Sequence, residues 1–464
     1  HPLEFVPVDQ RQPDGSGGTW ADPNRPCLLP GLPGGQLRYQ KEFNKFMLQP
    51  GQWTDDCSMA LCLADSLLVH GAYHGGDARC RWHMWWIHGY NNAFRCDEDR
   101  RIRTSVGLGG NVAKSLGDVE DFGIDQEDSA EKVPAIYDST TNDAGNGTIM
   151  RLAPVPIAYH VDLELAMDVA TKQSRATHPG CEAAACCCFM SHFIVEAIAA
   201  HQHGMDPSAN LQSFLREQVR GFLGSAEAKD SMQAFRGMAE ASVCEEALGR
   251  LRALLRCEPP SPKEQNWNWQ REELAIAEAI HARCSGPDGQ FDPSVTYNGH
   301  PVIPTYFGAY CMDGLAMALW ALWHSGSFAS CIQRVVNLLG DADTTAAIAG
   351  QLAGACYGWR GLCAEEWGRV SLANLKRWDP CAEIGLRAAV LYHHGPRPEV
   401  TLRQAEGHAS VRVFGEPRPG AAVRAEVPSL ERARVLGRQG DFVRVACRDV
   451  EGWVGLKNTV RLSF

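Results

Sequence analysis

The sequence lacks several features that mark membrane proteins and nucleic-acid-binding proteins. Its 464 residues are 45% hydrophobic and 21% charged. No uninterrupted apolar run approaches the roughly 18 residues of a membrane helix, since even Met59–Val69 contains Asp65. We therefore expect no membrane partner. The 55 acidic side chains outnumber the 44 basic ones, giving a net charge of −11, which argues against broad binding of nucleic acid phosphates.

Cysteines are present, but not in the patterns of a disulfide scaffold or a zinc site. The 18 cysteines lie well below the roughly 8–10% of a disulfide-rich chain. No Cys-x-x-Cys pair occurs, and Cys186, Cys187 and Cys188 are consecutive in an Ala-rich helical stretch. We interpret them as buried thiols and expect a cytoplasmic or other reducing intracellular location.

The pattern of apolar residues changes near residue 400. Helical periodicity marks four segments before it: Met59–His70, Cys181–His203, Gly314–His324 and Val335–Leu339. Short β-branched runs with turn signals follow it: Ser410–Phe414, Val423–Val427, Phe442–Cys447 and Trp453–Leu456. The sequence thus predicts a mainly α protein and a monomer: an all-α domain, residues 1–400, then a small all-β barrel, residues 408–464, with ten basic and six acidic side chains (net +4).

Two acidic segments stand beside helices and are candidates for metal binding. Each could simply cap a helix and complement its dipole. Together they offer four carboxylates and two hydroxyls, which are ligands for Mg²⁺, Mn²⁺ or Ca²⁺ and not for zinc. Four acids in one interior require cations. We therefore predict a binuclear Mg²⁺-type site in preference to two unrelated helix caps. The residues are Thr54, Asp55, Asp56, Asp341, Asp343 and Thr344.

Two glycine-rich stretches place flexible backbone ahead of helices. Backbone N–H groups at such positions bind phosphate, although each stretch alone could be a plain turn. His178 could contact a ligand or cap a helix. The candidate phosphate-binding residues are Ser105, Gly107, Gly109, Gly110, Gly145, Asn146 and Gly147.

The order of these motifs resembles the ADP-ribosylglycohydrolase family over roughly residues 1–390. The motifs are Thr-Asp-Asp, Gly-Asn-Gly-x-x-Met-Arg, Thr-His-Pro-Gly and Gly-Asp-x-Asp-Thr-Thr-Ala-Ala-Ile-Ala-Gly, with Tyr306–Leu319 between the last two. The resemblance implies two Mg²⁺ ions, with Mn²⁺ as an alternative, held by the six residues above at an ADP-ribose cleft. It also implies that the glycine loops lie against the diphosphate, that Asn146 and His178 line the ligand site, and that Tyr306 or Phe307 faces the adenine.

The resemblance further implies the reaction, which is Mg²⁺-dependent hydrolysis at C1 of the distal ribose. The partner would be an ADP-ribosylated protein or a small ADP-ribose conjugate. Glu4, Asp55 and Asp56 are the candidates for proton transfer. The family's opening helix does not precede His1, so we expect that helix to be missing. A catalytically inactive ADP-ribose-binding module is the alternative, and a structural protein is a third that the retained acids disfavour.

The last part of the chain resembles a bacterial-type Src-homology-3-like barrel. The resemblance is carried by Val423–Ser429, Val435–Arg438, Asp441–Val445 and Glu451–Gly455. It is shorter than the first, and Trp453 could lie in the core or in a ligand groove.

Overall fold

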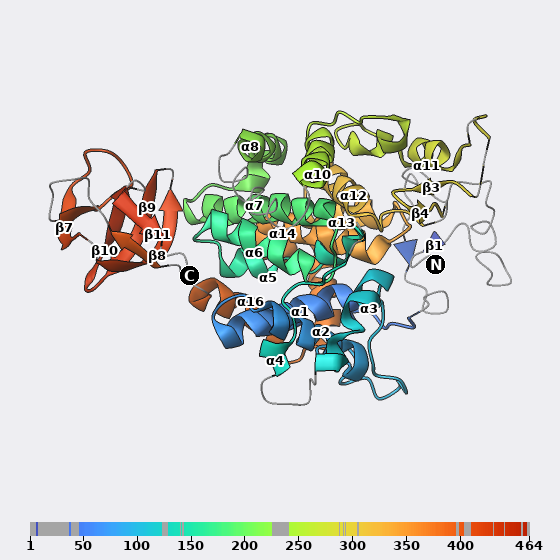
Figure 1. Cartoon of the computed structure of the whole chain (residues 1–464), viewed down its shortest axis with the longest axis horizontal. Helices are drawn as coiled ribbons and strands as arrows, with labels where there is room; N and C mark the ends of the chain where they lie inside the picture. Colours follow the sequence, from blue (N-terminus) through green and yellow to red (C-terminus); the bar gives the residue numbers. More distant parts are fainter. Residues whose placement is uncertain are drawn as a thin grey trace.

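The structure, a computed structural model, has a helical body with an antiparallel sheet at one end (Figure 1). It describes residues 6–7, 37–38, 46–122, 129–139, 141, 143–224, 241–286, 288–290, 292, 294–303, 306–395, 399–402, 410–429, 431–439, 441–455 and 458–461. Mainly helical architecture followed by a small all-β part is therefore confirmed.

The helices of the body have the following bounds in chain order. They are α1 (Asp55–His70), α2 (Gly75–His88), α3 (Gly110–Leu116), α4 (Ser129–Lys132), α5 (Pro154–Ala158), α6 (Leu163–Arg175), α7 (Cys181–Gln202), α8 (Leu211–Gly224), α10 (Ala241–Leu255), α11 (Ile276–Cys284), α12 (Cys311–Trp323), α13 (Phe328–Val336), α14 (Ala342–Ala364), α15 (Glu366–Lys376) and α16 (Glu383–His394). Short 3-10 helices are Val119–Phe122, Asn146–Thr148, Pro207–Asn210 and Pro262–Trp267.

Helix α7 runs through the middle of the body and contacts α6, α10, α12 and α14 (Figure 1). Most of its alanines and its cysteines, including Cys186 to Cys188, are buried and let neighbouring helices approach closely. By length and composition this helix could cross a membrane, but 83% of its most apolar window is buried inside the structure. The sequence expectation counted only apolar runs without interruption, and Glu182 and Glu196 interrupt this helix. The expectation that no stretch approaches membrane-helix length was therefore wrong.

The connection from α13 to α14 differs from the sequence prediction. The predicted helical segment Val335–Leu339 contains only the end of α13. Leu339 and Gly340 both have positive φ, of 61° and 69°, which a right-handed helix cannot continue. The chain turns here and starts α14, so that Asp341 and Asp343 stand at a helix N-terminus.

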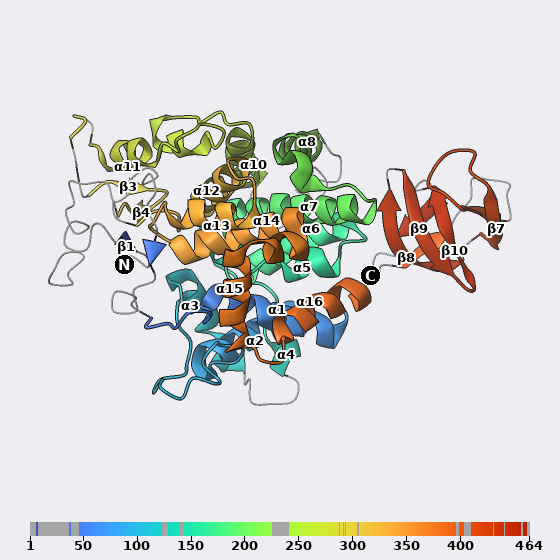
Figure 2. The ribbon, with the colours of Figure 1, turned by 180° about the vertical axis from the view of Figure 1, so that it is seen from behind.

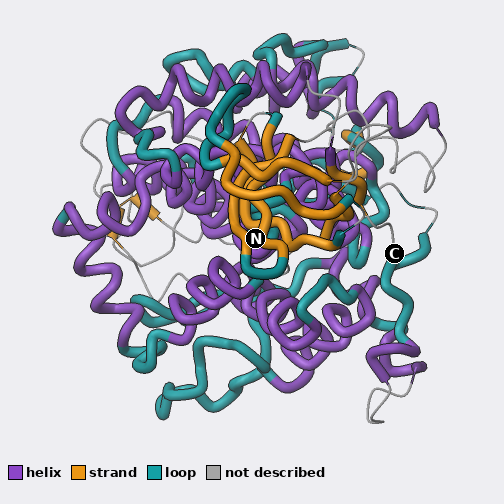
Figure 3. Tube along the Cα trace, turned by 90° about the vertical axis from the view of Figure 1, so that its left-hand side faces the viewer, coloured by secondary structure: helices purple, strands orange, loops and turns teal. Residues whose placement is uncertain are grey.

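The C-terminal strands form one seven-stranded antiparallel sheet in the order β11-β5-β8-β9-β10-β6-β7. Their bounds are β5 (Glu399–Leu402), β6 (Ser410–Phe414), β7 (Val423–Pro428), β8 (Arg432–Gln439), β9 (Phe442–Cys447), β10 (Val450–Gly455) and β11 (Thr459–Arg461). Its strands lie together in Figure 3. Alternate valines form its core, and Val161 from the helical body joins that core. In the described strands β7 and β11 are not paired with each other, so the closed barrel stays a prediction.

Two short hairpins and a pair of helices complete the body. The short strands β3 (Thr296–Tyr297) and β4 (His300–Pro301) form a hairpin, and β1 (Val6–Pro7) pairs with β2 (Leu37–Arg38). Helices α15 and α16 cover one side of the body, where α16 packs against α1 and α5 (Figure 2).

Candidate active site

A cleft of about 950 Å³ opens where the N-termini of α1 and α14 approach the glycine-rich loops. The β3–β4 hairpin and residues 306–310 also line it. Most of the predicted site residues line it, namely Asp55, Ser105, Gly107, Gly109, Gly110, Gly145, Asn146, Gly147, His178, Tyr306, Asp341, Asp343 and Thr344. Thr54 and Asp56 lie directly beside Asp55, whereas Glu4 falls outside the described residues.

The two acidic segments, far apart in the sequence, meet at one end of this cleft. The Thr54 hydroxyl donates to Asp56 Oδ2 at 2.8 Å and is 3.3 Å from Asp343 Oδ2, across 289 residues of sequence. Both segments begin helices, because Asp55 is the first residue of α1 and Asp341 precedes α14. The positive ends of two helix dipoles therefore face the same group of carboxylates.

Burial and mutual repulsion disfavour the ionised form of these carboxylates. Burial raises the pKa of Asp55 well above its ordinary value, and Asp56, Asp343 and Asp341 raise it further. The pKa of Asp56 is raised for the same reasons, first burial and then Asp343. Burial and Asp343 raise the pKa of Asp341 to about 7, although hydrogen bonds from Asn146, Tyr306 and Thr344 oppose the shift. Helix dipoles alone do not neutralise this group.

The donor set fits a hard divalent cation. Asp56 Oδ1 is buried without a hydrogen-bond partner in the described part of the chain, so one carboxylate oxygen is available to a ligand. Carboxylate and hydroxyl oxygens are the donors that Mg²⁺ and Mn²⁺ accept. Among the described residues no group of three or more His, Cys, Asp or Glu side chains is already arranged to hold a metal ion. Closing the cluster on an ion would require its side chains to rotate toward one another.

The glycine loops approach the acids and His178 so closely that a side chain would not fit at two positions. Gly107 has a φ of 85°, and a Cβ there would lie 2.0 Å from Asp55 Oδ1. A Cβ on Gly147 would lie 3.0 Å from His178 Cε1. Asn146, between two glycines, donates from Nδ2 to Asp341 Oδ2 at 2.5 Å. The second glycine loop is thus bonded directly to the acid cluster.

His178 is buried beneath this loop as a neutral side chain. Burial and, to a smaller extent, the nearby Arg151 lower its pKa to about 3. Its Nδ1 lies 2.9 Å from the Thr177 hydroxyl, which also accepts a hydrogen bond from Arg151 Nη2 at 2.7 Å. Arg151, the arginine of the Gly-Asn-Gly-x-x-Met-Arg motif, is therefore buried support for His178 and does not line the cleft.

Tyr306 lies at the acidic end of the cleft, where its side chain hydrogen-bonds Asp341. Phe307 also lines the cleft, and its backbone carbonyl accepts from the Asp341 N–H at 2.8 Å. The assignment of either ring to adenine stays a prediction.

Sequence reasoning missed a group of cleft-lining residues outside the acid cluster. Arg283 pairs with the buried Asp313 at 2.6 Å and stacks over the Tyr297 ring at 3.9 Å. Tyr310 donates to Glu182 at 2.7 Å, and burial raises the pKa of that glutamate. No spacing signal joins these residues, since they come from α7, α11, α12 and the β3–β4 hairpin. The quoted segment Tyr306–Leu319 contained two of them, Tyr310 and Asp313.

Comparisons with known proteins agree with the motifs. The ADP-ribosylglycohydrolase family model matches residues 2–394. The chain is 28% identical over 332 residues to the ADP-ribosylarginine hydrolase Tri1 of Pseudomonas putida (strain GB-1), covering 69% of this chain and 63% of that protein. It is 26% identical over 314 residues to the ADP-ribosyl-[dinitrogen reductase] glycohydrolase of Rhodospirillum rubrum, covering 67% and 71%.

Two further comparisons complete the picture. The Tri1 protein of Serratia proteamaculans (strain 568) is 26% identical, covering 68% of this chain and 62% of that protein. The chain thus spans less than two thirds of the length of either Tri1 relative. A solved structure described as an ADP-ribosylglycohydrolase-related protein complex aligns with a TM-score of 0.42 and 23% identity, over 76% of this chain and 90% of that one.

Proposed function

This chain belongs to the ADP-ribosylglycohydrolase family, a family of hydrolases, and from that membership we propose that it removes ADP-ribose from a modified protein side chain or a small conjugate. The bond broken would be the glycosidic bond at C1 of the distal ribose. The observation that supports this best is the meeting of four carboxylates and two threonines at one end of a cleft of about 950 Å³. Such a cleft has the size of a dinucleotide-like ligand site.

We propose that two Mg²⁺ ions bind at this end, with Mn²⁺ fitting the same oxygen donors. The residues that would hold them are Thr54, Asp55, Asp56, Asp341, Asp343 and Thr344. When bound, the ions neutralise the carboxylates, hold the distal ribose hydroxyls and stabilise charge that develops at the sugar. The raised pKa values of Asp55, Asp56 and Asp341 support cation binding, because a cation would offset the burial and the mutual repulsion that raise them.

The other residues of the cleft would bind and orient the substrate. Backbone N–H groups of the loops around Gly107 and Gly147 suit the diphosphate. The neutral His178 can hydrogen-bond there without placing another charge beside the acids. Asp55, which faces the cleft and lies against Gly107, is suited to accept a proton from the attacking water, with Asp56 as the alternative base.

Arginine-linked ADP-ribose is our first choice of substrate, because two relatives carry the name ADP-ribosylarginine hydrolase. The test is release of ADP-ribose from arginine-linked, serine-linked and acetyl-ester conjugates, with Mg²⁺ or with EDTA. Asp343→Asn should abolish release, whereas Asp99→Asn, at an exposed acid that does not line the cleft, should not. No release from any conjugate would refute the hydrolase, and ADP-ribose binding without release would favour the binding module.

For the C-terminal part we propose a small Src-homology-3-like barrel formed by residues 408–464. The valine core supports this fold. The net charge of +4 suits an acidic partner surface. An experimental structure in which the edge strands β7 and β11 both stay open to solvent would contradict the barrel.

A further inference from the structure

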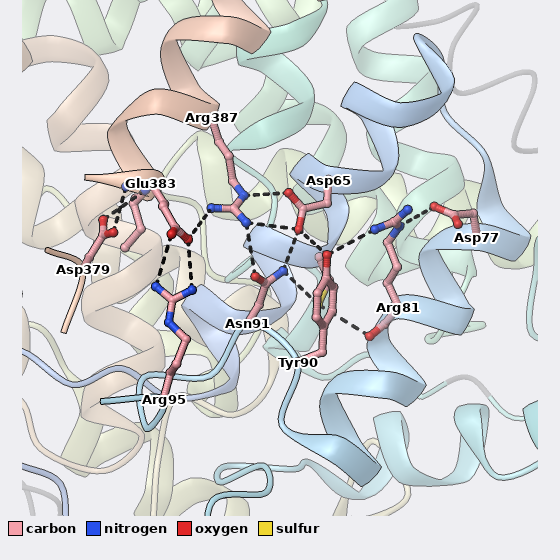
Figure 4. A network of polar contacts seen from close by, with 11 residues as sticks. Asp65, Asp77, Arg81, Tyr90, Asn91, Arg95, Asp379, Glu383 and Arg387 are labelled. Carbon is pink, nitrogen blue, oxygen red and sulfur yellow. Dashed lines mark hydrogen bonds and ion pairs between the residues drawn. The ribbon is translucent and has the colours of Figure 1, made fainter. Parts of the chain in front are cut away.

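We propose that Arg387 on α16 is a positioning residue for the acid cluster. Through Asp65 and Asn91, which Figure 4 shows beside Arg387, it holds Trp53, and with Trp53 the first turn of α1, which carries Thr54, Asp55 and Asp56. The inference rests on the proposed metal site, but the positioning itself can be measured without metal.

The first contact joins Arg387 to the middle of α1. Arg387 Nε donates to Asp65 Oδ1 at 2.6 Å, and Nη2 donates to Asp65 Oδ2 at 3.3 Å (Figure 4). Two parallel hydrogen bonds fix the relative orientation of the two planar groups. Burial would raise the pKa of Asp65, but hydrogen bonds from Arg387, Asn91 and Tyr90 hold it below its ordinary value. Asp65 therefore stays ionised and paired.

The second contact passes from this pair to the loop after α2. Arg387 Nη2 donates to Asn91 Oδ1 at 3.3 Å, and Asn91 Nδ2 donates to Asp65 Oδ2 at 2.8 Å. The three side chains thus form a closed triangle. Asn91 has a φ of 60°, a left-handed conformation that asparagine adopts more readily than most residues. The triangle fixes both the side chain and the backbone of Asn91.

The third contact reaches the segment that presents the acids. The Asn91 carbonyl oxygen accepts from Trp53 Nε1 at 3.0 Å, and Trp53 immediately precedes Thr54. Trp378, between α15 and α16, donates from Nε1 to the Pro50 carbonyl at 2.9 Å. Gly51 packs directly on the backbone of Asn374, where a Cβ would lie 2.4 Å from the carbonyl carbon. Residues 50–53 are therefore held between Asn91 and the α15–α16 corner.

This support matters because the acids repel one another. The Thr54 hydroxyl contacts the carboxylates of both Asp56 and Asp343, so like charges lie close together at the first turn of α1. A first turn of α1 held only by its own contacts would relax away from Asp343. Outer partners of metal ligands commonly change metal affinity by about 10- to 100-fold when they are removed.

The structure supplies a matched control in Arg81 on α2. Its Nε donates to Asp77 Oδ2 at 2.6 Å, and the side chains of this pair are 20% and 12% exposed. The Arg387–Asp65 pair has the same distance, with exposures of 20% and 13%. Arg81 lies one step further out in the same network, since its Nη1 donates to the Tyr90 hydroxyl at 3.3 Å and Tyr90 donates to Asp65 at 2.7 Å (Figure 4). Arg81→Gln thus removes an equivalent ion pair and leaves the direct contacts among Arg387, Asp65 and Asn91 in place.

The experiment compares Arg387→Gln, Arg81→Gln and Trp53→Phe in the full chain. Amide hydrogen exchange is measured in EDTA, and Mn²⁺ binding is measured by calorimetry. We expect exchange at residues 53–58 to accelerate about tenfold in Arg387→Gln and Trp53→Phe, and less than about twofold in Arg81→Gln. Mn²⁺ should bind about tenfold more weakly to the first two variants. The double variant should lose less than the product of the two single losses, because both break one connection.

The outcomes separate the two proposals. Equal exchange rates at residues 53–58 in Arg387→Gln and Arg81→Gln would overturn the positioning role, irrespective of the measured Mn²⁺ affinity. A wild-type chain that binds no Mn²⁺ would refute the metal site, while the exchange data would still decide the positioning. If Arg387→Gln does not fold, Trp53→Phe and Arg387→Lys decide, since Lys keeps the charge beside Asp65 and should retain part of the protection.

Discussion

Helix α1 carries two groups of carboxylates in opposite electrostatic situations. Asp55 and Asp56 stand at its N-terminus with raised pKa values, while Asp65, about 15 Å further along the helix, has a lowered one. All three lie largely inside the protein, so burial alone does not distinguish them. The difference is the partner: Asp65 has Arg387, and the N-terminal acids have chiefly one another.

This difference separates a carboxylate that stabilises the folded protein through an ion pair from carboxylates that are available to a ligand. A paired acid contributes to the folded state, whereas a group of acids that repel one another destabilises it. The proposed cation would neutralise such a group and offset its cost in stability. The comparison therefore assigns α1 two roles, binding at its first turn and anchoring two to three turns later.

The largest expected effect comes from changing an acid at the first turn. Asp55→Asn keeps the size of the side chain and removes one charged metal ligand, so kcat/KM on an arginine-linked ADP-ribose conjugate should fall at least about a hundredfold. The measurement is steady-state release of ADP-ribose at saturating Mg²⁺. Asp99→Asn serves as the exposed control, and activity of Asp55→Asn within threefold of wild type would remove Asp55 from the site.

The second prediction contrasts the two groups in stability. In EDTA, Asp65→Asn should lower the free energy of unfolding by about 1–3 kcal/mol, because it leaves Arg387 without its charged partner. Asp55→Asn should instead raise it by about 1 kcal/mol, because it relieves repulsion. Urea denaturation measures both. If both variants shift the free energy of unfolding in the same direction, Asp55 and Asp65 do not differ in their effect on the metal-free folded state.

Much of the acid cluster could be predicted from the sequence, because its residues are local motifs. Thr54 to Asp56 and Asp341 to Thr344 each lie within one short segment ahead of a helix, and small residues follow Asp343. Helix boundaries were also close, since the segment expected from Met59 belongs to α1 and the one from Cys181 to α7. The chemical types at these positions indicate the ligand even before the two segments are known to meet.

The anchoring network could not be predicted in this way. Arg387 is 322 residues from Asp65 and 296 from Asn91, and no periodicity or motif joins them. The same holds for Glu182, Arg283 and Tyr297 in the cleft. A lone arginine on a helix gives no sign of its partner, because charged residues are common on helix surfaces. Long-range pairs of this kind require the fold.

The third prediction concerns pH in the metal-free protein. The pKa of Asp341 is raised to about 7 in the folded state, against about 3.9 when unfolded, so the folded state binds the extra proton between these values. Its contribution to stability is therefore present below about pH 4 and is lost as the pH rises to about 7. Asp65, with its lowered pKa, acts in the opposite sense and only when the pH falls below about 4.

The neutral His178 also opposes Asp341, since its pKa is lowered to about 3. The measurement is therefore the difference between wild type and Asp341→Asn in urea denaturation. From pH 5 to pH 8 in EDTA, wild type should lose about 2–3 kcal/mol relative to the variant. Saturating Mg²⁺ should remove this difference, because the ion takes the place of the proton. An equal pH dependence in the two proteins would show that Asp341 is not strained by its neighbours.

The smallest expected effect lies within the anchoring network itself. Arg95 contacts Glu383 at 3.2 Å, as Arg387 does at 3.6 Å, but the Arg95 side chain is 59% exposed and that of Arg387 is 20% exposed. Water and salt screen an exposed pair, so Arg95→Gln should change the free energy of unfolding by less than about 0.5 kcal/mol. Arg387→Gln should lower the free energy of unfolding several times more. This loss should persist when the salt concentration is raised from about 0.15 M to about 0.5 M. Equal losses of stability in the two variants would mean that net charge near α16 anchors α1, and not the two hydrogen bonds from Arg387 to Asp65.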